Sequence, residues 1–430
     1  MKRALEEEPS ADEAAADDPP ARFETNADAY VDAGSALRLR FQHANEATYN
    51  PEFTHQIFDP DGAIECPLAE RPLRIDIVYA PATLDVRWSI IGDASASATA
   101  ALACLASAMP APAGDQRPIT TASELEALAG AVVCTYTHLG SEYTVHAAKL
   151  AGAPAARVRF SERLQTLFRF AIETSSPIDH ADERWELLAV FQAPPPGSGE
   201  VEKEEREYRL VAAATLFRFQ RWMAGRGPVP LLRLCQVTTL PPYRGAGHGA
   251  RLLNAVYERA ASLGAAELTI EDPNDGCRLL RDRVDYRNAC DRGLLPPAPT
   301  ADAIAPPTSE ALAQAREALL LTEEQCLRVS EMRQLAELRK RGEGDTDEAL
   351  KPLRLAAKRR LAKKHKEELD ALLSIQEHTG EDGDKGAGSK AADAPPTPTR
   401  DALVAAKKER LEQLWLELLQ EYDAAIAVRG

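Results

Sequence analysis

Residues 240–253, LPPYRGAGHGARLL, join a glycine-rich loop to the start of a helical pattern. Three glycines alternate with Ala246 and His248, at positions where a Cβ would hold a ligand away from the backbone. A glycine-rich turn at a helix N-terminus presents unpaired N–H groups and the positive end of the helix dipole, which together suit a phosphate. The stretch therefore predicts a strand-to-helix turn able to bind a phosphate group. The helical pattern continues through Leu252, Leu253, Val256, Tyr257 and Ala260.

Three interpretations of this loop stay open from its residues alone. The first is a tight turn without a ligand. The second is a dinucleotide site, because residues 245–250 match GxGxxA and Glu271 follows about twenty residues on. The third is a cradle for the pyrophosphate of an acyl-CoA, because residues 244–249 match (Gln/Arg)xxGx(Gly/Ala). Prolines between the strand and the glycines, and neighbouring strands that look antiparallel, count against the second.

The segments around the loop predict a central α+β domain. Upstream, the stretch SERLQTLFRFAIETSS has helical spacing, with Ser161 as a plausible N-cap. The stretches RWELLAVFQ, YRLVAAATLFRF and LLRLCQVTTL then read as consecutive antiparallel strands. Downstream, AELTI is strand-like, and another helix runs from about residue 275 to 292. This order of elements suits the fold of the N-acetyltransferases.

Composition predicts the remaining organisation. Residues 1–21 are acidic and lack large apolar side chains beyond Leu5, which predicts a disordered tail. Residues 22–152 predict an N-terminal mixed α/β domain, residues 153–295 the central domain, and residues 296–308 a proline-rich linker. Residues 309–430 predict a helical region, with helical patterns at 309–340, 347–376 and 400–427 and a disordered, low-complexity segment at 377–399.

Charge and cysteine content limit the classes of function. The chain has 51 Lys and Arg against 67 Asp and Glu, a net charge of −16, which disfavours nonspecific nucleic-acid binding and suits a cationic partner or simple solubility equally. Its seven cysteines are scattered and form no CxxC pair, so we expect no disulfide framework, no zinc site and a reducing compartment. Neither the N-terminus nor the alanine-rich run at 99–109 predicts a signal peptide or a membrane span.

Several stretches in this order resemble the catalytic subunit of type B histone acetyltransferase, a family of the GNAT superfamily. They are PEFTHQIF at 51–58, ERLQTLFRFAIETSSPID with DERW at 162–185, LPPYRGAGHGARLLNAVY at 240–257, LTIEDPND at 268–275 and LRDRVD at 280–285. The resemblance covers roughly residues 30 to 295 and is far more specific than the glycine pattern alone.

The resemblance implies transfer of acetyl from acetyl-CoA, without a metal, to lysines in the N-terminal tail of newly made, free histone H4. It implies direct attack in a ternary complex, and as partners a WD-repeat histone-binding subunit and histone H3 as the carrier of H4, with no direct contact to nucleic acid or membrane. It also implies residence in the nucleus and the cytoplasm.

The resemblance also implies which residues bind the cofactor. The strand residues Val237, Thr238 and Thr239 would hydrogen-bond the acyl and pantetheine groups. Asn274 and Arg283 fall where family members also contact the cofactor. The pyrophosphate would be held by Arg244, Gly245, Ala246, Gly247, His248, Gly249 and Ala250.

For catalysis, the resemblance places Glu271 at the general-base position, with Asp272 beside it and Glu173 as a second carboxylate. A lysine amine with a pKa near ~10.4 must lose a proton before it can attack a thioester, and a carboxylate can take that proton. A backbone N–H of residues 237–239 is the obvious donor to the oxyanion. From their positions alone, Glu271 and Asp272 could instead cap a helix, and Glu173 could be an exposed charge at a helix end.

For the acceptor, the resemblance implies that Phe217 and Phe219 line the histone channel and that Asp61 contacts the basic tail, although both phenylalanines also suit a strand core. The chain departs from the family pattern in three places. Gly62 replaces a frequent acid, Thr238 and Thr239 replace larger apolar residues, and the loop RWMAGRGPVP is longer than usual. The basic stretch AAKRRLAKKHKEEL at 356–369 predicts either a nuclear import signal or a solvated helix face.

Two rival functions remain open at this point. One is acetylation of a different amine. The other is a histone-binding module without catalysis.

Overall fold

The computed structural model describes most of the chain outside its N-terminal tail. The described residues are 30–42, 47–58, 63–65, 74–91, 103–109, 117–195, 207–223, 225, 227–296, 307–342, 344, 346–374 and 400–427. The predicted tail at 1–21, Asp61, most of the linker at 296–308 and the predicted disordered segment at 377–399 lie outside these residues. Within them, no helix is long and apolar enough to cross a membrane.

A mixed sheet of six strands forms the centre of the protein, in the order β11-β10-β9-β8-β7-β6. Every neighbouring pair is antiparallel except β10 and β11, which are parallel. The three consecutive antiparallel strands predicted from the sequence are confirmed as β8 to β10. The strands are β6 (Ala131–His138), β7 (Ser141–Lys149), β8 (Trp185–Gln192), β9 (Arg209–Met223), β10 (Gly227–Thr239) and β11 (Leu268–Ile270).

Strands β6 and β7 come from the part of the chain that the sequence analysis assigned to the N-terminal domain. They pair with β8 and complete the central sheet. The predicted boundary at residue 152 therefore separates strands that share one sheet. Strand pairing across such a distance leaves no local mark in the sequence, because alternation of apolar and polar residues looks the same in either sheet.

Helices cover both faces of the central sheet. Helix α5 (His248–Ser262) packs on one face, and the apolar residues that predicted it are buried there. Helix α4 (Ala155–Ala171) and helix α3 (Ala122–Ala129) pack on the other face. The prediction that Ser161 caps α4 was wrong: the helix begins one to two turns earlier, after Pro154, and the buried Ser161 hydroxyl bonds His180 at 3.0 Å.

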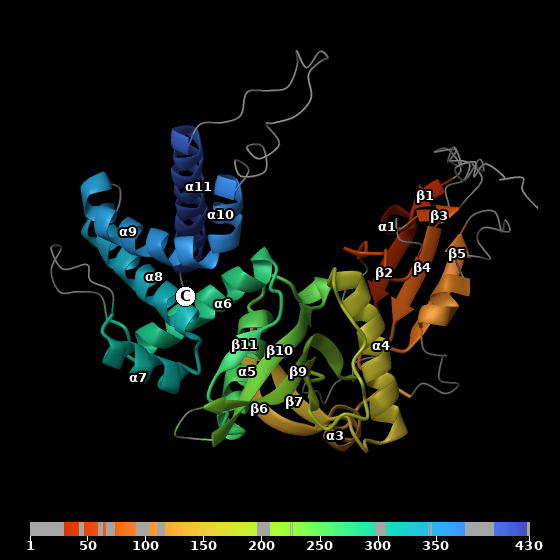
Figure 1. Ribbon diagram of the computed structural model, residues 1–430. Helices are drawn as coiled ribbons and strands as arrows, with labels where there is room; N and C mark the ends of the chain where they lie inside the picture. The colour runs from red at the N-terminus through yellow and green to blue at the C-terminus, as the bar shows by residue number, and fades with distance from the viewer. Residues whose placement is uncertain are drawn as a thin grey trace, which may run out of the picture.

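A small N-terminal sheet packs against the opposite side of α4, so that α4 stands between two sheets (Figure 1). Strand β4 (Arg74–Tyr79) alternates half-buried and buried residues along its length, as a strand with one face on a core should. It pairs in parallel with β2 (Leu37–Phe41) and antiparallel with β5 (Val86–Ile91). Nearby, β1 (Tyr30–Asp32) pairs with β3 (Ala63–Glu65), and the short helix α1 spans Ala33–Ala36.

The C-terminal region is helical and packs on α6 (Asp275–Asp291), as predicted in outline. Two of the three predicted helical patterns are broken. The first breaks at Leu320, where φ is +55° and Thr322 caps the next helix, and the second breaks at His365. The helices are α7 (Ser309–Leu319), α8 (Glu323–Arg341), α9 (Asp347–Lys364), α10 (Lys366–Ser374) and α11 (Arg400–Ile426).

The basic stretch at 356–369 lies in α9 and α10, and several of its charges pair within this region. Arg360 binds Glu331 of α8 at 2.8 Å, and Lys364 binds Glu324 at 3.0 Å. Lys358 pairs with Glu412 of α11. These basic residues therefore contribute to helix packing, which neither of the two predicted roles included.

A buried ionic cluster joins α6 to the C-terminal helices. The carboxylate of Asp282, whose side chain is 3% exposed, pairs with Arg328 of α8 and accepts a hydrogen bond from Gln325 at 2.9 Å. Arg328 also binds Glu421 of α11 at 2.9 Å. Three helices from distant parts of the sequence thus share one set of charges.

Removing one partner of this cluster leaves a buried charge without compensation. We expect Arg328→Met to lower the free energy of unfolding by about 3–5 kcal/mol. The matched control Arg341→Met removes a more exposed pair with Glu337 on the same helix and should cost under about 1 kcal/mol. Urea unfolding followed by circular dichroism measures both, and equal losses in the two variants would contradict a structural role for the buried cluster.

Candidate active site

A β-bulge in β10 determines which backbone groups of this strand point towards β9 and which point outward, to the side on which β11 lies. Before the bulge, the N–H of Leu232 and the carbonyl of Leu234 bond to the β11 side. The register then shifts between Leu234 and Gln236, and beyond it the N–H of Leu240 bonds β9 at Val211. Because backbone groups alternate in an antiparallel ladder, the N–H groups of Val237 and Thr239 point away from β9.

Strand β11 ends before it can pair with this part of β10. Its last register pair joins Ile270 to Leu234, and the N–H of Glu271 then bonds the Leu234 carbonyl at 2.9 Å. The chain turns away at Asp272, where φ is +32°. The two parallel strands therefore separate at the bulge and leave the outward edge at Val237 and Thr239 open to an extended ligand.

The glycine loop leads directly from this open edge to the N-terminus of α5. Gly245 and Gly247 have φ values of +78° and +84°, and a Cβ at either would meet no atom within 4 Å, so the space above the loop is free. Arg251 is the first residue of α5 whose N–H reaches a helical carbonyl, that of Gly247. Between Gly245 and Ala250 no described protein acceptor takes the backbone N–H groups, which makes this turn a suitable anion site.

The third glycine has a different role. A Cβ on Gly249 would lie 3.3 Å from Leu280 and 3.4 Å from the Thr239 hydroxyl. Its missing side chain lets α5 approach the end of β10 closely. The close approach places the glycine loop directly beside the open edge of β10.

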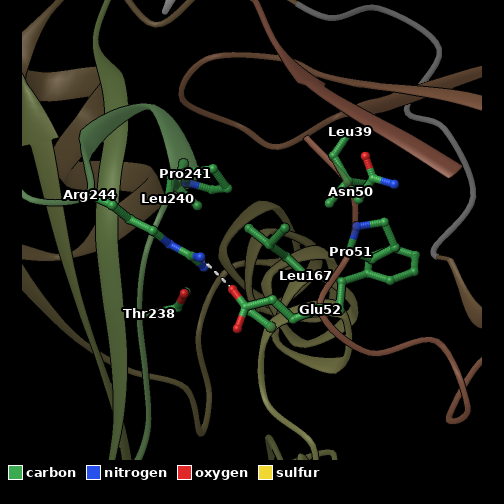
Figure 2. A pocket seen from close by; sticks show the side chains of 11 residues that line it. Leu39, Asn50, Pro51, Glu52, Leu167, Thr238, Leu240, Pro241 and Arg244 are labelled. Carbon is green, nitrogen blue, oxygen red and sulfur yellow. Dashed lines mark ion pairs between the residues drawn. The ribbon is translucent and has the colours of Figure 1, made fainter. Parts of the chain in front are cut away.

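Arg244 lies at the junction of the loop and the strand. Its Nε donates to the Thr239 carbonyl at 3.0 Å, and its guanidinium forms an ion pair with Glu52 of the N-terminal region. The pair lies across a small pocket between β10, α4 and residues 50–52 (Figure 2). The side chain predicted to hold pyrophosphate is thus already in contact with an anionic group.

His248 is an anchor of the loop, which the sequence did not reveal. Its side chain is buried, its Nδ1 lies 2.8 Å from the Tyr136 hydroxyl of β6, and its ring centroid lies 4.7 Å from that of Tyr143 of β7. Burial and the nearby His138 lower the pKa of His248 to about 4. A neutral imidazole therefore ties the start of α5 to the β6–β7 hairpin.

Glu271 is exposed and lies where β11 ends. Its carboxylate lies 3.6 Å from the Arg233 guanidinium, which in turn lies 5.2 Å from the centre of the Phe219 ring. Burial, and then contact with Glu271, raise the pKa of the Cys235 thiol at the bulge. The structure thus brings Glu271 next to the bulge and, through Arg233, next to one of the two predicted channel aromatics. The other, Phe217, packs on Trp185 with 4.8 Å between ring centroids.

Gln236, which the sequence analysis did not single out, connects this strand to α4. Its buried amide accepts hydrogen bonds from Thr215 at 2.9 Å and Gln165 at 3.1 Å, and donates to Ser175 at 2.9 Å. It also donates to the carbonyl of Ser176 at 2.8 Å. The sequence did contain a signal for this role: Gln236 is a polar residue within an apolar strand, close to the glycine loop.

These bonds fix the turn that carries Glu173. The Glu173 side chain is exposed at the end of α4, and its carbonyl lies 3.1 Å from His55 Nε2 and accepts a hydrogen bond from Gln56 at 2.5 Å. Gln236 holds the turn from the sheet side, and residues 55 and 56 hold it from the N-terminal side.

Two predicted cofactor residues have other contacts. Asn274 is the N-cap of α6, and its side chain accepts the Cys277 N–H at 2.9 Å, so Asn274, not Glu271 or Asp272, is the residue that caps this helix. Arg283 donates to the Ala424 carbonyl of α11 at 3.1 and 3.3 Å. Local sequence patterns could not predict this contact, because its two residues lie 141 positions apart in the sequence.

Part of the sequence that forms the central sheet matches a known protein family. Residues 160–280, from α4 through β11 into α6, match the Acetyltransferase (GNAT) family. The parallel unit β10-α5-β11 also suits a dinucleotide site, but the other strands are antiparallel, unlike the mostly parallel sheets of dinucleotide-binding folds. The chain therefore contains a GNAT acetyltransferase domain, which supports the acyl-CoA interpretation of the glycine loop.

The chain is also similar to proteins named histone acetyltransferase type B catalytic subunit. It is 27% identical to that of Aspergillus oryzae over 301 residues, which cover 59% of this chain and 57% of the relative. It is 30% identical to that of Yarrowia lipolytica over 37% of each chain, and 32% identical to that of Zea mays over 29% of this chain and 24% of the relative. The chain thus matches less than two thirds of each relative's length.

Burial of neutral His248 predicts a specific loss of stability in acid. Its pKa of about 4 in the fold lies below the ordinary value of about 6.5, so the unfolded chain binds the proton more readily. The contribution is fully present above pH 6.5 and is lost as the pH falls towards 4. We expect urea unfolding to show about 2 kcal/mol more loss between pH 7.5 and pH 5 in the wild type than in His248→Gln. Parallel pH profiles for the two proteins would contradict this account.

Proposed function

We propose that this protein is a histone lysine N-acetyltransferase that transfers acetyl from acetyl-CoA to N-terminal-tail lysines of free, newly synthesised histone H4. The observation that carries the proposal is the run of N–H groups without a protein acceptor at residues 245–250, next to the outward N–H groups of Val237 and Thr239, within a GNAT domain. The names of its relatives support histone as the acceptor. The net charge of −16 suits a basic tail.

The open edge of β10 and the loop fit the two halves of the acetyl-CoA molecule. The outward N–H groups of Val237 and Thr239 would pair with the amides of the pantetheine arm. The N–H groups of residues 245–250 and the α5 dipole would bind the pyrophosphate, with Arg244 adding a positive charge. The cofactor supplies an activated acetyl thioester, and the protein supplies its position and an N–H donor near the bulge.

Glu271 is the residue that we propose as general base. It is exposed, it follows β11 directly, and it lies beside the bulge thiol of Cys235 and the Arg233 guanidinium. A lysine ammonium needs a proton acceptor before its nitrogen can attack, and a carboxylate within reach supplies one. Asp272 and Glu173, both exposed, would attract the cationic tail, and Phe217 and Phe219 would flank the path of the lysine stem.

The proposal includes the partners and locations that the family resemblance implies. A WD-repeat histone-binding subunit would present H4 together with H3, in the nucleus and the cytoplasm. The acidic surface charge is consistent with association with histones rather than with nucleic acid.

The test incubates the full chain with labelled acetyl-CoA and an H4-tail peptide, with spermidine as a competing acceptor. We expect labelled peptide from the wild type and a kcat reduced about 10²–10³-fold in Glu271→Gln, because the proton acceptor is lost. Glu317→Gln, an exposed glutamate on α7, is the matched control and should retain wild-type activity.

Each rival predicts a different result. Equal rates for Glu271→Gln and the wild type would contradict the base assignment. Preference for spermidine over the peptide would favour acetylation of another amine. Tight peptide binding without labelled product from the wild type would identify a binding module without catalysis.

A further inference from the structure

The pocket in Figure 2 lies beside the cofactor strand and differs in composition from the glycine loop. Its walls are mainly apolar and come from three parts of the protein: Leu39 of the N-terminal sheet, Leu167 and Phe170 of α4, and Leu240 after β10. Glu52 brings the one carboxylate among its lining residues. While Arg244 is paired with Glu52, the pocket has room for only about one or two water molecules, so a side chain with an apolar stem and a cationic tip could enter only after Arg244 moves.

The backbone of Glu52 is fixed, whereas its side chain is half exposed. The N–H groups of Glu52 and Phe53 bond the Phe170 carbonyl at 2.8 and 3.1 Å. The carboxylate is 42% exposed, and its ion-pair partner Arg244 is 45% exposed. An ion pair this accessible is worth little and exchanges readily, because water competes for both charges.

Arg244 therefore has two competing anionic partners. In this structure its guanidinium binds the Glu52 carboxylate, so an arginine of the protein itself occupies the cation position of the pocket. The proposed function requires the same guanidinium for the cofactor pyrophosphate. A doubly charged pyrophosphate, held also by the N–H groups of α5, competes well against one exposed carboxylate.

We propose that this pocket is a subsite for a cationic side chain of the acceptor, lysine or arginine, with Glu52 as its counter-ion, and that cofactor binding opens it by drawing Arg244 to the pyrophosphate. The inference rests on the proposed function and adds to it a substrate-binding carboxylate and an order of binding. The cofactor frees Glu52 from Arg244, and the freed carboxylate then binds the acceptor.

The exchange couples the two substrates thermodynamically. If the cofactor removes Arg244 from Glu52, it tightens binding of a cationic acceptor, and the acceptor tightens cofactor binding by the same factor. The segment that carries Glu52 also carries His55 and Gln56, which bind the Glu173 carbonyl. Exchange at Arg244 therefore occurs beside the turn that holds the second carboxylate.

The first measurement titrates coenzyme A into the full-length chain by calorimetry. Glu52→Gln removes the competitor, so we expect it to bind coenzyme A about two- to fivefold more tightly than the wild type. Misfolding cannot produce tighter binding. The matched control Glu337→Gln breaks an Arg–Glu pair on α8 and should bind coenzyme A as the wild type does. Unchanged or weaker binding by Glu52→Gln would overturn the competition.

The second measurement titrates a basic H4-tail peptide with and without saturating coenzyme A. The wild type should bind the peptide about two- to fivefold more tightly with coenzyme A present, and Glu52→Gln should bind it weakly in both conditions. Coupling that survives in Glu52→Gln would overturn the cationic subsite.

Arg244→Gln separates this inference from the proposed function: if it binds coenzyme A as the wild type does, the pyrophosphate assignment fails. If it binds weakly while Glu52→Gln shows no gain, only the competition fails.

Discussion

The bulge between Leu234 and Gln236 is the constraint on which the site depends. Without the extra residue, the backbone groups of β10 beyond Leu234 would keep their alternation, and the N–H groups of Val237 and Thr239 would bond to β9. With it, they face the gap left where β11 ends at Ile270. One irregular residue in this thirteen-residue strand thus leaves the outward N–H groups of Val237 and Thr239 without a strand partner. The glycine loop continues that edge, because Gly249 lets α5 lie close to Thr239.

The surrounding structure holds this edge from both faces of the sheet. On the α4 face, the buried Gln236 amide binds Thr215, Gln165 and the turn after Glu173, so displacing the bulge would break several buried hydrogen bonds at once. On the α5 face, neutral His248 fixes the start of the helix to β6 and β7. Farther away, the ionic cluster around Asp282 anchors α6, the helix that follows the end of β11.

Local patterns predicted the elements of the site, and contacts between distant segments decided its details. The period of α5, the three antiparallel strands and the glycine loop were predictable because each depends on residues close in sequence. The bulge, the burial of His248 and the Arg244–Glu52 pair were not, because each needs a partner more than twenty residues away or a register that no single strand encodes. The contact of Arg283 with α11 was missed for the same reason. The start of α4 was missed for a local reason: the helix begins directly after Pro154, and the Ser161 hydroxyl, inside the helix, bonds His180.

The central claim is that the outward edge of β10 and the N-terminus of α5 form one acetyl-CoA site. Amide hydrogen exchange of the full chain, followed by NMR with and without coenzyme A, tests it most directly. The account predicts that the N–H groups of Val237, Thr239 and residues 245–250 exchange more slowly when coenzyme A is bound, while those of Gln236 and Thr238, which already face β9, change little. Slowing at Gln236 and Thr238 without Val237 and Thr239, or no slowing between residues 245 and 250, would contradict it.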